Sequence, residues 1–244
     1  MPLFTKTLKL KAFTKNRFGR YLLYALGEVI LVVLGILIAL NINNLNEENK
    51  QKKALDAILE NVSYDLKTDT TIIAQAIKYY DARQKISDDI LDDQYKLDEL
   101  RKCYLCKSMI TNYFPVTIND KGYSQLKDFN AGNISRDSLV VNIVQFYKAF
   151  SNILEDIGGQ VEKNSLENIA IWREKEPWFS EFIRGRSSEE FNKYMTTQDF
   201  KNRVAYFKTI ACSNYLTILK SYKGNAQEVL TLINERFAEQ ETTP

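Results

Sequence analysis

One apolar stretch near the start of the chain limits the fold more than any other feature. From Tyr21 to Leu40 the only charged residue is Glu28. About 20 helical residues, each rising about 1.5 Å, cover the roughly 30 Å hydrocarbon core of a lipid bilayer. The sequence therefore predicts a transmembrane helix over residues 20–42. The protein is then expected to cross the membrane once, with the lipid bilayer as one of its partners.

The residues before this stretch are basic and include no Asp or Glu. Because short basic flanks stay on the cytoplasmic side, residues 1–19 are predicted to form a cytoplasmic arm. Residues 43–244 would then form an extracytoplasmic domain. The basic residues are Lys6, Lys9, Lys11, Lys15, Arg17 and Arg20.

The apolar stretch is also longer than that of a cleaved signal peptide, which has about 7–15 residues and ends at small residues. Here the apolar residues run directly into Asn41, Ile42, Asn43 and Asn44, and Ala39 is the only small residue nearby. We therefore expect an uncleaved signal anchor.

Charge is distributed unevenly along the chain. The net charge is +2, and because the basic arm contributes +6 and Glu28 contributes −1, residues 43–244 carry −3. A domain of this charge lacks the basic surface that nucleic-acid binding requires. We therefore expect no nucleic-acid partner, and we expect the arm to be attracted to anionic lipid head groups.

Histidine is absent from the sequence, which removes the residue that many hydrolases and metal sites depend on. We predict a protein that is not an enzyme and has no cofactor or metal. Cys103 and Cys106 form a Cys-x-x-Cys pair, and Cys212 is the third cysteine. Three sulfurs without imidazole do not make a four-ligand zinc site. The alternatives for Cys103 and Cys106 are a thiol-exchange role and plain helix packing, with or without a disulfide.

Residues 45–92 place apolar side chains at steps of three and four, as one face of an α-helix requires. No glycine or proline occurs from residue 36 to residue 114, so this helix is expected to continue the anchor without a break. A second, shorter helix over residues 97–113 is expected to fold back. The segment Phe114–Gly122 interrupts the pattern with a proline and an Asn-Asp-Lys-Gly cluster, which predicts a loop.

The C-terminal half also has helical periodicity and almost no strand signal. The predicted features, in chain order, are a short helix over 123–129, a turn at Asn130-Ala131-Gly132, a long helix capped by Ser135 and kinked at Gly158-Gly159 that ends at Pro177, a loop or short turn over 178–186, and a last helix over 198–238 capped by Thr197. The expected fold class is all-α, with an N-terminal transmembrane helix that continues into an elongated antiparallel helical bundle.

Two segments resemble a family of uncharacterised membrane proteins that occurs in many copies in flavobacteria and related Bacteroidota. The first is GRYLLYALGEVILVVLGILIALNINNLNE, residues 19–47, and the second is GYSQLKDFNAGNISRDSLVVNIVQFY, residues 122–147. The second segment has Ala131-Gly132 where the family has a Ser-Gly pair. The resemblance implies an inner-membrane address and a helical periplasmic part, and it implies no activity.

Small residues line one side of the anchor. Gly27, Leu31, Gly35 and Ala39 are spaced by four, and Gly35-x-x-x-Ala39 is a step at which membrane helices approach closely. Glu28 borders this face and belongs to the family signature, so the resemblance makes it a candidate contact residue. We predict self-association, or docking on another membrane protein, through this face. The alternatives are that glycine is common in such helices and that Glu28 is protonated or reaches the inner head groups.

Four aromatic residues, Trp172, Trp178, Phe179 and Phe182, lie close together in the sequence. They are a candidate binding surface at the end of the bundle, and the alternative is that they are core packing. The loop Phe114–Gly122 is the other candidate binding surface.

These observations favour a membrane-anchored, non-enzymatic interaction or scaffold protein of the bacterial cell envelope. Its expected partners are a protein or a second copy of the chain, bound through the transmembrane helix and the bundle. One alternative is an extracytoplasmic small-molecule sensing module that signals through a membrane partner. Another is a subunit of an ion-driven membrane complex that uses Glu28.

Overall fold

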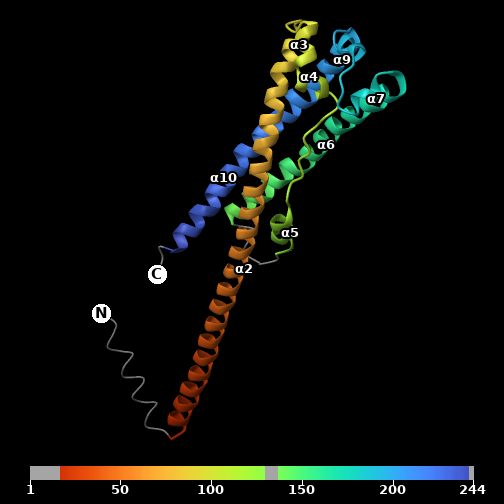
Figure 1. Ribbon diagram of the computed structural model, residues 1–244. Coiled ribbons are helices and arrows are strands. Elements are labelled where there is room, and N and C mark those ends of the chain that lie inside the picture. The colour runs from red at the N-terminus through yellow and green to blue at the C-terminus, as the bar shows by residue number, and fades with distance from the viewer. Residues whose placement is uncertain (1–16, 130–136, 242–244) are drawn as a thin grey trace. The chain divides into compact units, whose positions relative to one another are not determined.

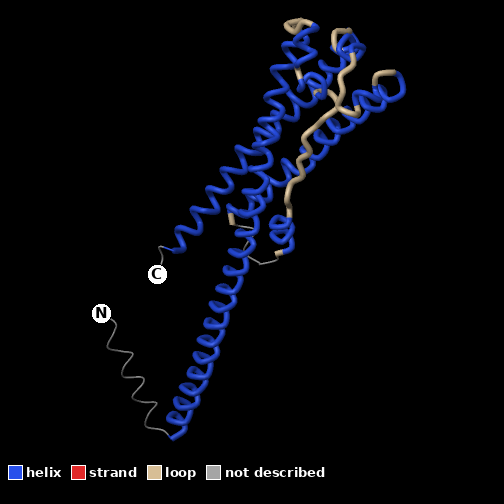
Figure 2. Tube along the Cα trace, viewed as in Figure 1, coloured by secondary structure: helices blue, strands red, loops and turns tan. Residues whose placement is uncertain are grey.

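The computed structural model describes residues 17–129 and 137–241, which fall into two units, Met1–Asp56 and Ala57–Pro244 (Figure 1). Three predicted features lie outside the described residues: most of the basic arm, the turn at residues 130–132, and the cap at Ser135. Among the described residues there are helices and loops and no strand (Figure 2), which confirms the all-α prediction.

The first helix, α2, runs from Arg17 to Leu91, which confirms that the apolar stretch continues into the following helix without a break. In the first unit, every described side chain from Tyr21 to Lys50 is exposed. Of the described helices, α2 is the one that is long and apolar enough to cross a membrane.

The second unit is built on three long helical segments that pack together. They are the part of α2 from Ala57 onward, α6 (Ser138–Lys175), and the consecutive helices α9 (Gln198–Phe207), η2 (Lys208–Tyr215) and α10 (Leu216–Glu241). Their inner faces supply the core, with Leu59, Val62, Leu66, Ile73 and Tyr80 from α2, Phe146, Leu154, Val161 and Trp172 from α6, and Val204, Phe207, Leu219, Tyr222 and Ile233 from the third segment.

The third segment runs antiparallel to α2. Ion pairs join Lys201 to Asp93 and Lys208 to Asp88. Further along, the Nζ atom of Lys220 lies 2.8 Å from Oδ1 of Asp81. The lysine numbers rise as the aspartate numbers fall, which shows that the two segments run in opposite directions.

The connection from α2 to α6 differs from the predicted helix over residues 97–113. Two short helices, α3 (Leu97–Lys102) and α4 (Tyr104–Ser108), are separated by Cys103, whose backbone is extended, with φ −78° and ψ 95°. From Met109 the chain leaves helical structure and returns along α2 as a loop. The short helix α5 (Lys121–Asp128) then precedes α6, close to the predicted 123–129.

Helix α6 begins two residues later than a Ser135 cap would allow. Asp137 is the cap, and its carboxylate accepts hydrogen bonds from the backbone N–H groups of Leu139 and Val140. Residues 158 and 159 are helical, so the predicted kink does not interrupt α6. The helix ends at Lys175, just before Pro177, as predicted.

The segment between α6 and α9 contains two short helices. The first, α7 (Phe179–Phe182), is a single turn within the predicted loop or short turn, and the second, α8 (Glu189–Tyr194), was not predicted. The cap at Thr197 is confirmed, because its side chain accepts a hydrogen bond from the backbone N–H of Phe200. The predicted single helix over 198–238 contains a π-helical stretch, η2, which widens the turn before α10 begins.

Candidate functional site

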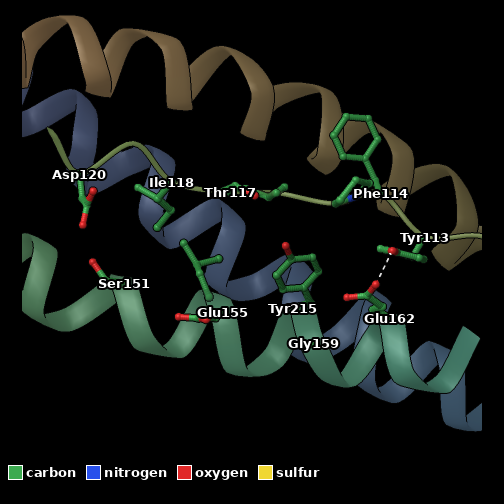
Figure 3. Close-up of a pocket in the computed structure, with 14 residues that line it drawn as sticks. Tyr113, Phe114, Thr117, Ile118, Asp120, Ser151, Glu155, Gly159, Glu162 and Tyr215 are labelled. Carbon is green, nitrogen blue, oxygen red and sulfur yellow. Dashed lines mark hydrogen bonds between the residues drawn. The ribbon is translucent and has the colours of Figure 1, made fainter. Parts of the chain in front are cut away.

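A groove with a volume of about 510 Å³ lies between α6 and the loop segment 113–120, which we call the strap (Figure 3). Tyr215, the last residue of η2, also lines the groove. The full lining is Tyr113, Phe114, Pro115, Val116, Thr117, Ile118, Asp120, Ser151, Leu154, Glu155, Gly158, Gly159, Glu162 and Tyr215. The groove therefore includes most of the loop that the sequence marked as a candidate binding surface.

The strap is an extended chain. Pro115 cannot donate a backbone hydrogen bond, and it biases Phe114 away from helical dihedrals. Along the strap, Phe114, Val116 and Ile118 are half-buried while Pro115 and Thr117 are exposed. The main-chain groups of residues 116–118 form no hydrogen bond with the described residues, so this part of the strap has unused donors and acceptors.

Side chains of α2 hold the strap near both ends. Near its start, the hydroxyl of Tyr80 accepts a hydrogen bond from the backbone N–H of Phe114 (3.1 Å) and donates one to the same residue's carbonyl (3.3 Å). Near its end, the carboxylate of Asp69 accepts hydrogen bonds from the backbone and side-chain amides of Asn119. Two residues beyond the end of the strap, the backbone N–H of Gly122 donates a hydrogen bond to the carboxylate of Asp65 at 2.7 Å.

Asp69 is almost completely buried, with 1% of its surface exposed. It also accepts a hydrogen bond from the hydroxyl of Tyr222 on α10 at 2.9 Å. Burial raises the pKa of Asp69, while the hydrogen bonds from Asn119 and Tyr222 act in the opposite direction. One carboxylate therefore connects α2, the strap and α10.

The groove is acidic. Its lining includes the carboxylates of Asp120, Glu155 and Glu162 and no Lys or Arg. Glu155 and Glu162 are two turns apart on α6, about 10 Å along the helix axis. Glu162 accepts a hydrogen bond from the hydroxyl of Tyr113 at 2.7 Å, so the wall on α6 also contacts the strap. The sequence analysis did not identify this wall, because Glu155 and Glu162 are seven residues apart and Asp120 belongs to another segment.

Tyr215 supplies an unpaired polar group in the groove. Its side chain is 1% exposed, and its hydroxyl has no hydrogen-bond partner among the described residues. Its ring meets that of Tyr80 edge to face, with 5.4 Å between the ring centroids. Burial raises the pKa of Tyr215 to about 12, so its hydroxyl is protonated at neutral pH.

Gly158 makes room for this hydroxyl. A Cβ atom at position 158 would lie 3.2 Å from the Tyr215 hydroxyl oxygen, whereas one at position 159 would meet nothing within 4 Å. We expect Gly159→Ala to raise the melting temperature, because alanine favours the helix by up to about 1 kcal/mol. Gly158→Ala should have a free energy of unfolding about 1 kcal/mol lower than that of Gly159→Ala, because the side chain of Tyr215 must move. Thermal unfolding of both variants checks this, and equal melting temperatures would contradict the close contact.

The sequence comparisons agree with the resemblance of the anchor and of residues 122–147. A family model described as a family of unknown function (DUF6090) matches residues 28–171. The chain belongs to this family. The DUF6090 match includes the strap and the acidic residues of α6, and it ends before Tyr215. No curated protein and no solved structure matches the chain.

The aromatic residues that were predicted as a candidate binding surface lie at the far end of α6. Trp172 is fully buried and donates a hydrogen bond from Nε1 to the hydroxyl of Tyr194 at 3.0 Å. Trp178 is also buried and packs edge to face on Trp172, with 5.1 Å between centroids. Phe182 contacts both tryptophans and, with Phe179, is half-buried. The two tryptophans therefore pack inside the unit.

The structure joins Cys103 and Cys106 in a disulfide. Cys106 is fully buried, and its backbone N–H donates to Sγ of Cys103. The remaining cysteine of this DUF6090 chain, Cys212, is a free buried thiol, and burial raises its pKa to about 12. Cys212 is therefore protonated and unreactive at neutral pH. Among the described residues no group of acidic or cysteine side chains is arranged to hold a metal ion.

The predicted association face of the anchor lies in the first unit. Gly27, Glu28, Leu31, Gly35 and Ala39 are all exposed there on α2. A Cβ atom added at Gly27 or at Gly35 would meet nothing within 4 Å. Association of DUF6090 chains through this face stays a prediction.

Proposed function

We propose that this protein is a membrane-anchored, non-enzymatic interaction protein of the bacterial cell envelope. Its anchor is the apolar part of α2, and its interaction module is the helical unit Ala57–Pro244, which we place in the periplasm. The observation that carries the proposal is the exposure of the large apolar side chains from Tyr21 to Leu45 on a helix that continues into a packed bundle.

Exposure of this kind is unfavourable in water. Soluble monomers seldom expose contiguous apolar patches of more than a few hundred Å². In a bilayer the same side chains contact lipid chains, and the α-helix pairs its own backbone groups, so no protein partner is needed. The basic residues before the helix favour a cytoplasmic N-terminus. The groove beneath the strap supports a binding role for the second unit.

Thiol labelling of intact spheroplasts tests the topology. We expect a cysteine introduced by Gln160→Cys, at an exposed position of α6, to react with a membrane-impermeant maleimide. A cysteine introduced by Thr5→Cys should react only after lysis. The native cysteines give little background, because one pair is a disulfide and the third is buried. The reverse pattern would contradict the proposed orientation. Release of the protein by an alkaline carbonate wash would contradict the anchor itself.

Cross-linking in native membranes, followed by affinity purification, tests the interaction role. We expect a defined protein, or a second copy of this chain, to be recovered with the full-length protein. A matched control replaces residues 20–42 with an unrelated transmembrane helix, which separates partners of the bundle from partners of the anchor. Recovery of no defined partner with either protein would contradict the proposal.

A further inference from the structure

The groove beneath the strap has the charge of a site for a cation. Asp120, Glu155 and Glu162 line it without a basic residue among them, and Asp120 and Glu155 form no ion pair with the described residues. The three carboxylates are spread along the groove (Figure 3) and do not form a metal site. An elongated ligand with separate positive groups matches this arrangement better than a single ion.

A second observation points to a ligand independently of the charge. The side chain of Tyr215 is almost completely buried, and its hydroxyl is directed into the groove, where it has no partner among the described residues. A tyrosine hydroxyl can both donate and accept a hydrogen bond. Because this one opens onto the groove, a donor or acceptor on a bound molecule can pair with it.

The strap provides a third observation, which concerns the kind of ligand. It is extended, and the main-chain groups of residues 116–118 have no partner among the described residues. An extended main chain with unused N–H and C=O groups is the feature to which peptides bind by adding a strand. A protonated polyamine can donate to the free C=O groups but has no acceptor for the N–H groups, whereas a peptide main chain can pair with both.

We propose that the groove binds an extended polypeptide segment that carries Lys or Arg side chains. The main chain of the segment pairs with the strap, and its basic side chains reach Glu155 and Glu162. The hydroxyl of Tyr215 forms a further hydrogen bond with the segment. This inference rests on the proposed function, since it names the chemistry of the partner and the surface that recognises it.

Peptide binding to the full-length protein in nanodiscs of phosphatidylcholine tests the proposal, because this lipid has no net charge to attract the probe. The probes are three fluorescent octapeptides with blocked ends that differ only in whether two lysines are two, three or four positions apart. We expect saturable binding of at least one. Glu155→Gln and Glu162→Gln should each weaken it about tenfold. Asp156→Asn removes an equal charge from the neighbouring residue, which does not line the groove, and should have little effect.

Tyr215→Phe separates binding from folding. Removing a buried hydroxyl that has no partner should leave the melting temperature unchanged or raise it, yet weaken the peptide about fivefold. N-methylation of the peptide backbone should also weaken binding. Three results would overturn the proposal: no binding of any peptide, equal weakening by Asp156→Asn, or binding of spermidine as tight as that of the best peptide. None of these would affect the labelling or cross-linking results, so the two proposals fail separately.

Discussion

Gly122→Ala is expected to lower the free energy of unfolding by about 3 kcal/mol or more. A Cβ atom at position 122 would lie 2.5 Å from the backbone nitrogen of Val62 and 2.8 Å from its Cα atom. Both atoms belong to the backbone of α2, so no side-chain rotation can relieve the clash. The substitution would also disturb the 2.7 Å hydrogen bond from the N–H of Gly122 to Asp65. Denaturant unfolding followed by circular dichroism measures the loss.

Gly224→Ala is the matched control. Position 224 is also helical, and a Cβ atom there would meet nothing within 4 Å. Alanine should therefore stabilise α10 by up to about 1 kcal/mol. If Gly122→Ala were as stable as the wild type, α5 would not lie directly against α2, and the end of the strap would not be fixed where the structure places it.

Asp69→Ala is expected to cost about 3 kcal/mol. It removes the acceptor for both amides of Asn119, which are partly buried, and for the buried hydroxyl of Tyr222. Asp69→Asn should cost only about 1 kcal/mol, because its amide oxygen still accepts from Asn119 and its NH₂ group can donate to Tyr222. Denaturant unfolding at pH 7 compares the two, and equal losses would contradict the hydrogen-bond network.

The stability of the wild type and that of Asp69→Asn should depend differently on pH. Burial raises the pKa of Asp69 above its ordinary value of 3.8, so the folded state favours the protonated carboxyl. The resulting stabilisation is complete below the ordinary value and is lost as pH rises through the pKa of Asp69 in the folded protein. Asparagine cannot titrate, so the cost of Asp69→Asn relative to the wild type should be largest near pH 4 and should shrink towards pH 7. A cost that grows with pH would contradict the burial effect.

Local sequence signals predicted the long elements of the fold. The absence of glycine and proline from residue 36 to residue 114 indicated the continuous α2 helix, and Thr197 marked the start of α9 correctly. The break at Cys103 was missed because residues 97–113 keep a helical pattern through it. The π-helical stretch η2 was missed because spacings of three and four do not reveal one wide turn.

The groove was only partly visible in the sequence. Pro115 and the Asn-Asp-Lys-Gly cluster identified the strap as a loop and as a candidate surface. Glu155 and Glu162 share one face of α6 with Gly158 and Gly159, and this spacing of seven could have indicated the opposite wall. Tyr215 was not identified as a groove residue, because an unpaired hydroxyl is recognised only when its neighbours in space are known.

The two anchors of the strap also determine its length. Asp69 and Tyr80 are eleven residues apart on α2, about 16 Å along the helix axis. The strap residues that they hold, Asn119 and Phe114, are five residues apart, and five extended residues also span about 16 Å. The segment is therefore taut and has no slack for an inserted or deleted residue. An insertion or deletion between residues 114 and 119 would therefore break the contact with Asp69 or the contact with Tyr80.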